Sequence, residues 1–159
     1  MSADVSIGTP TMADLEALID LWVELAADQR RHGSHLEADE NRERIRESLA
    51  RQVALSEVRI ACRDDRIVGF VTFTIEGSTF ERSVTRGLIQ NIYVAPESRG
   101  QGIGSRLLQA AESALREDGA DVFGLEAMAR NEAARRFYDR HGYGPHRLIL
   151  EKSTENDTP

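Results

Sequence analysis

The sequence is short of two reactive residue types, because Cys62 is its only cysteine and Lys152 its only lysine. A lone cysteine excludes an intrachain disulfide and favours a cytoplasmic location. No apolar run approaches the roughly 20 residues that a membrane-spanning helix needs. Residues 1–9 also lack the basic and apolar stretches of a signal peptide. We therefore expect a cytoplasmic protein with no membrane partner.

Acidic residues outnumber basic ones. The chain has 27 acidic against 20 basic residues, and its formal net charge is -7. A nucleic-acid-binding protein would normally present a basic face, so we expect no nucleic-acid partner. The acidic, lysine-poor composition fits a salt-adapted host and equally a GC-rich genome, and the sequence leaves both readings open.

What remains is the composition of a globular protein. The 159 residues are 40% hydrophobic and 30% charged, which fits one domain with a core of ordinary size. There is no internal repeat and no linker. We predict a single domain over residues 1–152, followed by a disordered polar tail over residues 153–159.

Hydrophobic periodicity predicts ten elements in the order β-α-α-β-β-β-α-β-α-β. Thr11 and Asp14 form a capping pattern before the first helix, and Pro96 ends the strand before the third helix. The order indicates a single-domain α/β fold, with a mixed central β-sheet flanked by helices. The expected strands are 5–9, 57–62, 67–75, 88–94, 122–128 and 147–151, and the expected helices are 12–27, 40–53, 102–118 and 131–140.

Three glycines at alternate positions, Gly100, Gly102 and Gly104, separate a predicted strand from a predicted helix. Such a turn leaves backbone N–H groups free at the positive end of the helix dipole, which suits a phosphate. The lysine of a Walker loop is absent, and Ser105 stands where the dinucleotide fingerprint needs glycine. The spacing alone is also compatible with a simple turn that starts a helix.

The wider pattern is more specific. Arg99-x-x-Gly102-x-Gly104, preceded by Ile92-Tyr93-Val94-x-Pro96-Glu97, resembles the acetyl-CoA signature of GNAT N-acetyltransferases. The resemblance implies acetyl-CoA as co-substrate, with its pyrophosphate on the glycine loop and its pantetheine arm along the preceding strand. The residues that it assigns to the cofactor are Ile92, Tyr93, Val94, Arg99, Gly100, Gln101, Gly102, Ile103, Gly104 and Ser105.

A second motif resembles the second GNAT segment, which adds Asn131, Ala134 and Phe137 to the cofactor contacts and Tyr138 to the catalytic residues. Asn131 also stands where an N-cap is expected. A tyrosine stays protonated at neutral pH and can donate to the departing CoA thiolate, which is the role that the resemblance gives Tyr138. The alternative is that the Phe137–Tyr138 pair only packs the helix on the sheet.

Many GNAT proteins carry a glutamate as general base where this chain has Gln90, which cannot accept a proton. Glu126 is the next candidate. It lies twelve residues before Tyr138, the spacing of base and acid in the ribosomal-protein alanine N-acetyltransferase branch. The alternative is a strand glutamate paired with an arginine. We predict no metal, and interpret His32 and His35 as solvated loop residues.

Together these features predict an N-acetyltransferase that moves acetyl from acetyl-CoA directly to a primary amine of a small molecule or a protein N-terminus. Direct transfer is favoured because no cysteine or serine lies in a recognisable nucleophile setting. The rival hypothesis is a CoA-binding regulatory domain with little catalysis. Uncovered sheet edges leave a homodimer possible.

Overall fold

The computed structural model describes residues 4–77 and 80–155. Within them one five-stranded sheet runs in the order β1–β2–β3–β4–β5, with every pair antiparallel except β4 and β5. The strands are β1 (Ser6–Gly8), β2 (Val58–Arg63), β3 (Arg66–Ile75), β4 (Arg86–Val94) and β5 (Val122–Leu125). The helices are α1 (Leu15–Arg30), α2 (Arg42–Ala54), α3 (Ile103–Glu117) and α4 (Glu132–Arg140).

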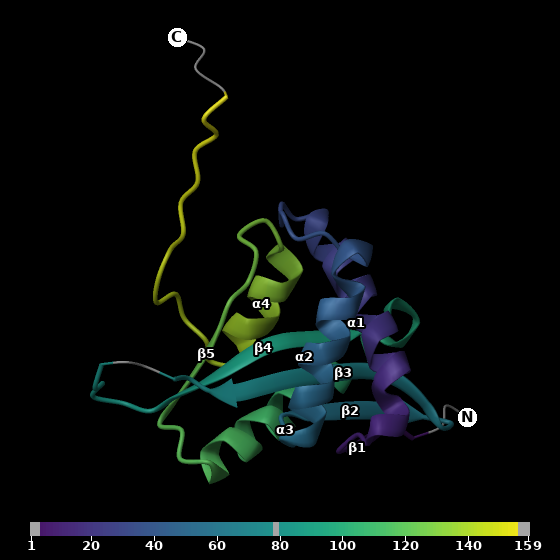
Figure 1. The fold of residues 1–159 in the computed structure, drawn as a ribbon. Helices are drawn as coiled ribbons and strands as arrows, with labels where there is room; N and C mark the ends of the chain where they lie inside the picture. Colours follow the sequence, from purple (N-terminus) through teal and green to yellow (C-terminus); the bar gives the residue numbers. More distant parts are fainter. Residues whose placement is uncertain (1–3, 78–79, 156–159) are drawn as a thin grey trace.

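Helices cover both faces of the sheet (Figure 1). Leu18 and Ile19 of α1 and Leu49 of α2 pack with Phe70 in one buried cluster. On the opposite face, a second cluster joins the apolar side of α3 to Val71 and Phe73 of β3 and Ile89 of β4. Phe137 of α4 is half buried and packs against this cluster. The sheet thus separates two cores, and the predicted α/β class is confirmed.

Local signals fixed several boundaries as expected. Asp14 Oδ2 accepts a hydrogen bond from the Thr11 N–H at 2.8 Å, ahead of α1. Asp64 and Asp65 form the tight turn between β2 and β3, with φ of 51° and 60°. Both are in the left-handed region, which two-residue hairpin turns require and aspartate tolerates.

The predicted last strand, residues 147–151, is wrong. This segment lies beside no other strand in the described chain, and the side chains of Leu148, Ile149 and Leu150 are 80%, 78% and 88% exposed. Figure 1 shows it in yellow, rising away from α4 and β5. An alternating apolar pattern predicts an extended segment, but a β-strand also needs a neighbouring strand to pair with. Residues 147–151 pair with no strand among the described residues. The expected tail begins with exposed residues 153–155, and residues 156–159 lie outside the described residues.

Two irregularities in β4 shape the region that follows it. The β3–β4 ladder pairs Thr72 with Asn91 and then Phe73 with Ile89, so Gln90 is the extra residue of a β-bulge. The parallel ladder to β5 ends at Ile89 and Leu125, whereas β4 continues to Val94. The two strands therefore part, and the last five residues of β4 have no strand on that side within the described chain.

Candidate functional site

The glycine loop lies where β4 ends and α3 begins. Gly100 and Gly102 have φ of 77° and 79°, and a Cβ added to either would meet no atom within 4 Å. Gly102 is the N-cap of α3. Glycine is thus needed at both positions for backbone conformation, and open space lies in front of both. The N-terminus of a 15-residue helix faces this space, which suits an anion.

Arginines brace the loop from two sides. Arg99 Nε donates to the Val94 carbonyl oxygen at 2.9 Å, and its guanidinium lies 5.3 Å from the centre of the Tyr93 ring. Arg63, at the end of β2, donates through Nη1 to Ser98 Oγ at 3.4 Å and through Nη2 to Gln101 Oε1. Sequence patterns gave no sign of Arg63, because β2 precedes the loop by some 35 residues.

Helix α4 packs directly on the start of α3. A Cβ on Gly104 would lie 3.4 Å from Phe137 Cζ, so the absence of a side chain allows this close approach. His141 joins the same two helices: its Nδ1 donates to the Phe137 carbonyl oxygen at 2.7 Å. Its Nε2 then accepts from the Ser105 hydroxyl at 2.9 Å when the imidazole is neutral. Sequence reasoning overlooked His141 although Ser105 was a candidate.

The start of α4 is capped as expected. Asn131 Oδ1 accepts a hydrogen bond from the Ala134 N–H at 3.1 Å. Ala134 and Tyr138 are four residues apart on α4, about one helical turn, and so lie on the same side of the helix. The capping role of Asn131 is confirmed, and its contact with a cofactor stays a prediction.

Tyr138 lies between two aromatic rings. Its ring centre is 5.3 Å from that of Phe137 and 6.1 Å from that of Tyr143, both edge to face. Burial raises the pKa of Tyr138 to about 12. Its hydroxyl makes no hydrogen bond to any described residue, whereas Tyr143 donates to Glu112 Oε2 at 2.7 Å. Tyr138 therefore has a protonated hydroxyl left to donate.

The candidate base differs from its expected setting. β5 ends at Leu125 rather than at residue 128, so Glu126 is exposed and lies outside the strand. The expected strand over residues 122–128 is therefore too long at its C-terminal end. However, Glu126 follows the last paired residue of β5, just as Gln90 follows that of β4. The two residues therefore lie at the point where the strands part. Gln90 is exposed and its Oε1 accepts from Gln52 Nε2 at 2.9 Å.

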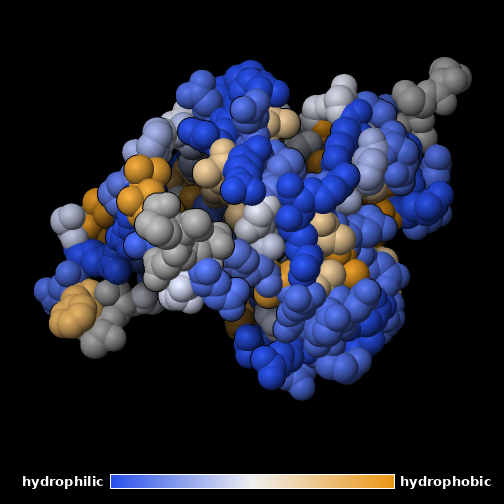
Figure 2. All heavy atoms as spheres, turned by 90° about the horizontal axis from the view of Figure 1, so that it is seen from above, coloured by the Kyte–Doolittle hydropathy of each residue, from blue (hydrophilic) through white to orange (hydrophobic). Residues whose placement is uncertain are grey.

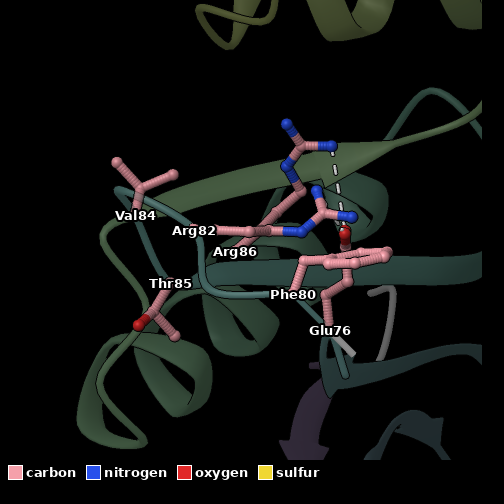
Figure 3. A pocket seen from close by; sticks show the side chains of 6 residues that line it. All are labelled: Glu76, Phe80, Arg82, Val84, Thr85 and Arg86. Atoms are coloured by element: carbon pink, nitrogen blue, oxygen red, sulfur yellow. Dashed lines mark ion pairs between the residues drawn. The ribbon is translucent and has the colours of Figure 1, made fainter. Parts of the chain in front are cut away.

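A pocket lies at the opposite end of β4, around the β3–β4 connection (Figure 3). Glu76 is paired there with Arg82 at 2.9 Å and with Arg86 at 3.7 Å. β4 begins at Arg86, beside the pocket, and ends at Val94, beside the glycine loop. About 25 Å of strand therefore separates the pocket from the loop. The pocket is not part of the candidate site.

The structure thus brings most of the predicted residues together around the end of β4 and the facing ends of α3 and α4. No helix in the described ranges has the length and apolar character to cross a membrane. Among the residues that the structure describes, no three His, Cys, Asp or Glu side chains are grouped as metal ligands.

The described residues thus form an α/β fold in which the sheet opens beside a glycine loop and helices cover both faces. The model of the Acetyltransferase (GNAT) family matches residues 17–143. The chain therefore belongs to the GNAT acetyltransferase family.

Two curated relatives are N-acetyltransferases by name. The aminoalkylphosphonate N-acetyltransferase of Salmonella typhimurium is 36% identical over 85 residues, which are 54% of either chain. N-alpha-acetyltransferase 30 of Schizosaccharomyces pombe is 34% identical over 84 residues, 53% of this chain and 55% of that protein. The chain thus spans about half the length of the curated relatives it matches. The aminoglycoside N-acetyltransferase AAC(6')-Iy, solved in complex with CoA, superposes with a TM-score of 0.74 over 97% of both chains, at 17% identity.

Proposed function

We propose that the protein transfers an acetyl group from acetyl-CoA directly to a primary amine. The observation that carries this proposal is the opening between β4 and β5, which leads to a loop with two left-handed glycines at the start of α3. Acetyl-CoA fits this arrangement, because it is a flexible acyl carrier with an anionic pyrophosphate in the middle of its length.

The cofactor would be held mainly by main-chain groups. Backbone N–H groups of residues 101–105 would bind the pyrophosphate, helped by the positive end of the α3 dipole. Residues 92–94 of β4 have no strand on the β5 side among the described residues, and their free N–H and C=O groups would pair with the amide groups of pantetheine. Phe137 and Ala134 would contact the cofactor from α4.

Tyr138 would stabilise the departing sulfur. With its pKa raised by burial to about 12, its hydroxyl stays protonated throughout the neutral range. A simple thiol has a pKa of about 8.5, so complete proton transfer from Tyr138 to the thiolate would be uphill. Tyr138 would therefore donate a hydrogen bond to the thiolate and keep its proton. Such a charge-assisted bond strengthens as negative charge develops on sulfur.

Glu126 would accept the proton from the amine, directly or through water. An alkyl ammonium is about a thousandth neutral near pH 7.4, so a positioned carboxylate accelerates the reaction. Gln90 cannot take this role, but Glu126 lies across the same opening. Its exposure gives water easy access.

The acceptor would be a small amine or a protein N-terminus. The two relatives named above acetylate, by their names, an aminoalkylphosphonate and an α-amino group. Both acceptors carry an amino group, but the rest of the molecule differs between them. The alternative function is a CoA-binding regulatory domain, which only Gln90 favours.

The test is calorimetric titration with acetyl-CoA of the wild type, Gly102→Val and Gly119→Val. Gly119 follows the C-cap of α3, with φ of 97° and nothing within 4 Å of an added Cβ, so its variant carries similar backbone strain away from the loop. We expect one-site binding that Gly102→Val loses and Gly119→Val keeps. Absence of binding by folded wild type would refute the proposal.

Turnover is measured as release of free CoA thiol with aminoalkylphosphonates, peptides with free N-termini and polyamines. We expect at least one class to be acetylated, and Glu126→Gln to lower the rate and weaken its rise with pH. Binding of acetyl-CoA without turnover on any acceptor would favour the regulatory alternative. An unchanged pH–rate profile in Glu126→Gln would remove that residue from the mechanism.

A further inference from the structure

Two polar side chains meet within the sheet where the opening begins. Asn91 of β4 and Thr72 of β3 are cross-strand partners, and Asn91 Nδ2 donates to Thr72 Oγ1 at 2.9 Å. Thr72 is fully buried and Asn91 is half buried. Such a hydrogen-bonded pair adds little net stability, because apolar residues of the same shape can replace both partners at almost no cost. Packing of the sheet alone therefore does not explain the pair.

The pair faces the side of the sheet that α1 and α2 cover. Side chains two residues apart on a strand share a face. Phe70, two residues before Thr72, belongs to the core cluster with α1 and α2, and so does Tyr93, two residues after Asn91. The bulge turns Gln90 to this side as well, because its side chain is hydrogen-bonded to α2. Two consecutive amides of β4 thus lie on one face.

The bond to Thr72 fixes the direction of the Asn91 amide. The nitrogen points toward β3, and the oxygen, which diverges from it at the same carbon, points to the side that β5 has left. Asn91 Oδ1 makes no hydrogen bond with a described residue. In the described chain Arg63 Nε is the only buried side-chain polar atom without a partner, so this oxygen is open to solvent. An accessible hydrogen-bond acceptor therefore lies at the start of the opening.

The residues around the opening are polar. Gln90 and Glu126 are both exposed at the point where the strands part. The surface seen from above is also largely hydrophilic, with hydrophobic residues in a few separate groups (Figure 2). An amine therefore meets polar surroundings at the opening.

We propose that Asn91 Oδ1 accepts a hydrogen bond from the acceptor amine, and that Thr72 positions the amide for this contact. The inference deepens the proposed function and rests on it. A neutral primary amine has two N–H groups and a lone pair. Asn91 holds one N–H, Glu126 or its water faces the other, and the lone pair is left to attack the acetyl carbon.

The proton and the electrons of the transfer balance without Asn91. The C–N bond forms from the amine lone pair, the C–S bond breaks, and CoA leaves as a thiolate hydrogen-bonded to Tyr138. Glu126 takes the proton that the amine nitrogen loses. Asn91 neither gains nor loses a proton, so its contribution is to orient the nitrogen.

The arrangement makes the number of N–H groups a basis of selectivity. A neutral secondary amine has one N–H, and proton transfer to Glu126 uses it, so none is left for Asn91. A primary amine keeps a hydrogen bond that its N-methyl analogue loses. The expected preference for the primary amine is about tenfold in kcat/KM, the effect of one hydrogen bond.

The test compares matched amines in variants of the full chain. The probes are 2-aminoethylphosphonate, an alanine-initiated tripeptide and putrescine, each beside the secondary amine with one methyl group on every amino nitrogen. Asn91→Leu keeps the approximate shape without polar atoms, Thr72→Val removes the hydroxyl, and Thr72→Ser restores it. Thr74→Val is the matched control, because Thr74 is two residues along the same strand and its side chain bonds to no described residue.

We expect Asn91→Leu and Thr72→Val to lower the preference for the primary amine at least about threefold, and Thr72→Ser and Thr74→Val to keep it. Each variant should bind acetyl-CoA within about twofold of wild type in calorimetry, which shows that it is folded. Removing the methyl-sensitive N–H or the oxygen deletes the same hydrogen bond, so a general structural defect would lower both rates without changing their ratio.

Three outcomes would overturn the inference. Equal kcat/KM for both amines in wild type, or an unchanged ratio in Asn91→Leu, would remove the contact with Asn91. A ratio that changes in Asn91→Leu but not in Thr72→Val would remove the positioning role of Thr72. Wild type that binds acetyl-CoA but acetylates no amine would refute the proposed function itself, and the inference with it.

Discussion

Arg63 connects the end of β2 to the glycine loop through side-chain hydrogen bonds. It donates to Ser98 and Gln101, while its Nε is buried without a hydrogen-bond partner among the described residues. A buried donor without a partner carries a free-energy penalty, which the hydrogen bonds of the same guanidinium to the loop offset. We interpret Arg63 as a residue that positions the loop for a phosphate.

We predict that Arg63→Met weakens acetyl-CoA binding about fivefold, or about 1 kcal/mol, because the loop loses its brace. Arg66→Met is the matched control, since Arg66 is exposed and forms no hydrogen bond or ion pair with the described residues. Both variants lose one positive charge. Equal weakening in titration calorimetry would mean that charge alone acts, and no weakening would remove Arg63 from this role.

For Tyr138→Phe we predict a turnover about 10- to 100-fold lower, with the acetyl-CoA dissociation constant changed less than twofold. The reason is that the hydroxyl donates to sulfur as charge develops, and such a bond is worth about 1.5–3 kcal/mol. Steady-state kinetics and calorimetry provide the two readings. Full turnover in the variant would leave Tyr138 as a packing residue.

Tyr143 makes stability depend on alkaline pH. Burial, and then its hydrogen bond to Glu112, raise the pKa of Tyr143 above its usual 10. The folded state therefore keeps a proton that the unfolded state releases above about pH 10, so the free energy of unfolding falls as pH rises through that range. We predict that Tyr143→Phe lowers this free energy by about 1 kcal/mol at neutral pH and flattens its alkaline decline. Urea unfolding at neutral and alkaline pH measures both; an unchanged slope would contradict the assignment.

Among single residues, those with a local signature were predictable. Asn131 was recognised as a cap, and Gly102 as a loop glycine, because both roles depend on neighbours within a few positions. Arg63 and His141 were not recognised. Their contacts join β2 to the loop and α4 to α3, and such contacts appear only when distant segments are brought together.

Elements meet closely where β4 packs on α3. A Cβ on Gly87 would lie 2.9 Å from Leu115 Cδ1 and 3.0 Å from its Cβ, so the helix can approach the strand only over a glycine. We predict that Gly87→Ala lowers the free energy of unfolding by about 1–3 kcal/mol through overpacking. Gly8→Ala, in β1 with nothing within 4 Å, should change it by less than about 0.5 kcal/mol. Equal values in urea unfolding would exclude the steric explanation.

Element types followed from hydrophobic periodicity better than element ends did. The amphipathic pattern of α3 was correct to within a residue at each end. β5 is shorter than its apolar run because β4 diverges from it after Ile89, and a ladder partner is not visible in the pattern of one strand. The bulge at Gln90 has the same origin, since it is a property of the β3–β4 pairing. Residues 147–151 show the pattern of a strand without its neighbour.

At the scale of the whole molecule, a net charge of -7 disfavours the compact state through self-repulsion. Raising the salt concentration from about 0.01 M to 1 M shortens the screening length from about 30 Å to about 3 Å. We predict that this change stabilises the protein by about 1 kcal/mol and raises its melting temperature by about 2–4 °C. Thermal unfolding monitored by circular dichroism measures the shift. A folded fraction that is unchanged up to multimolar salt would argue against salt adaptation.

The parting of β4 from β5 also has a consequence for how the protein can be redesigned. Under the proposed function the cofactor is gripped by main-chain groups along β4, and these persist whichever side chains the strand carries. Most point substitutions in β4 should therefore leave the binding of acetyl-CoA unchanged. The acceptor half depends on side chains such as Gln90 and Glu126, at the point where the strands separate. A library randomised there could therefore be selected for new amines while every member still loads acetyl-CoA.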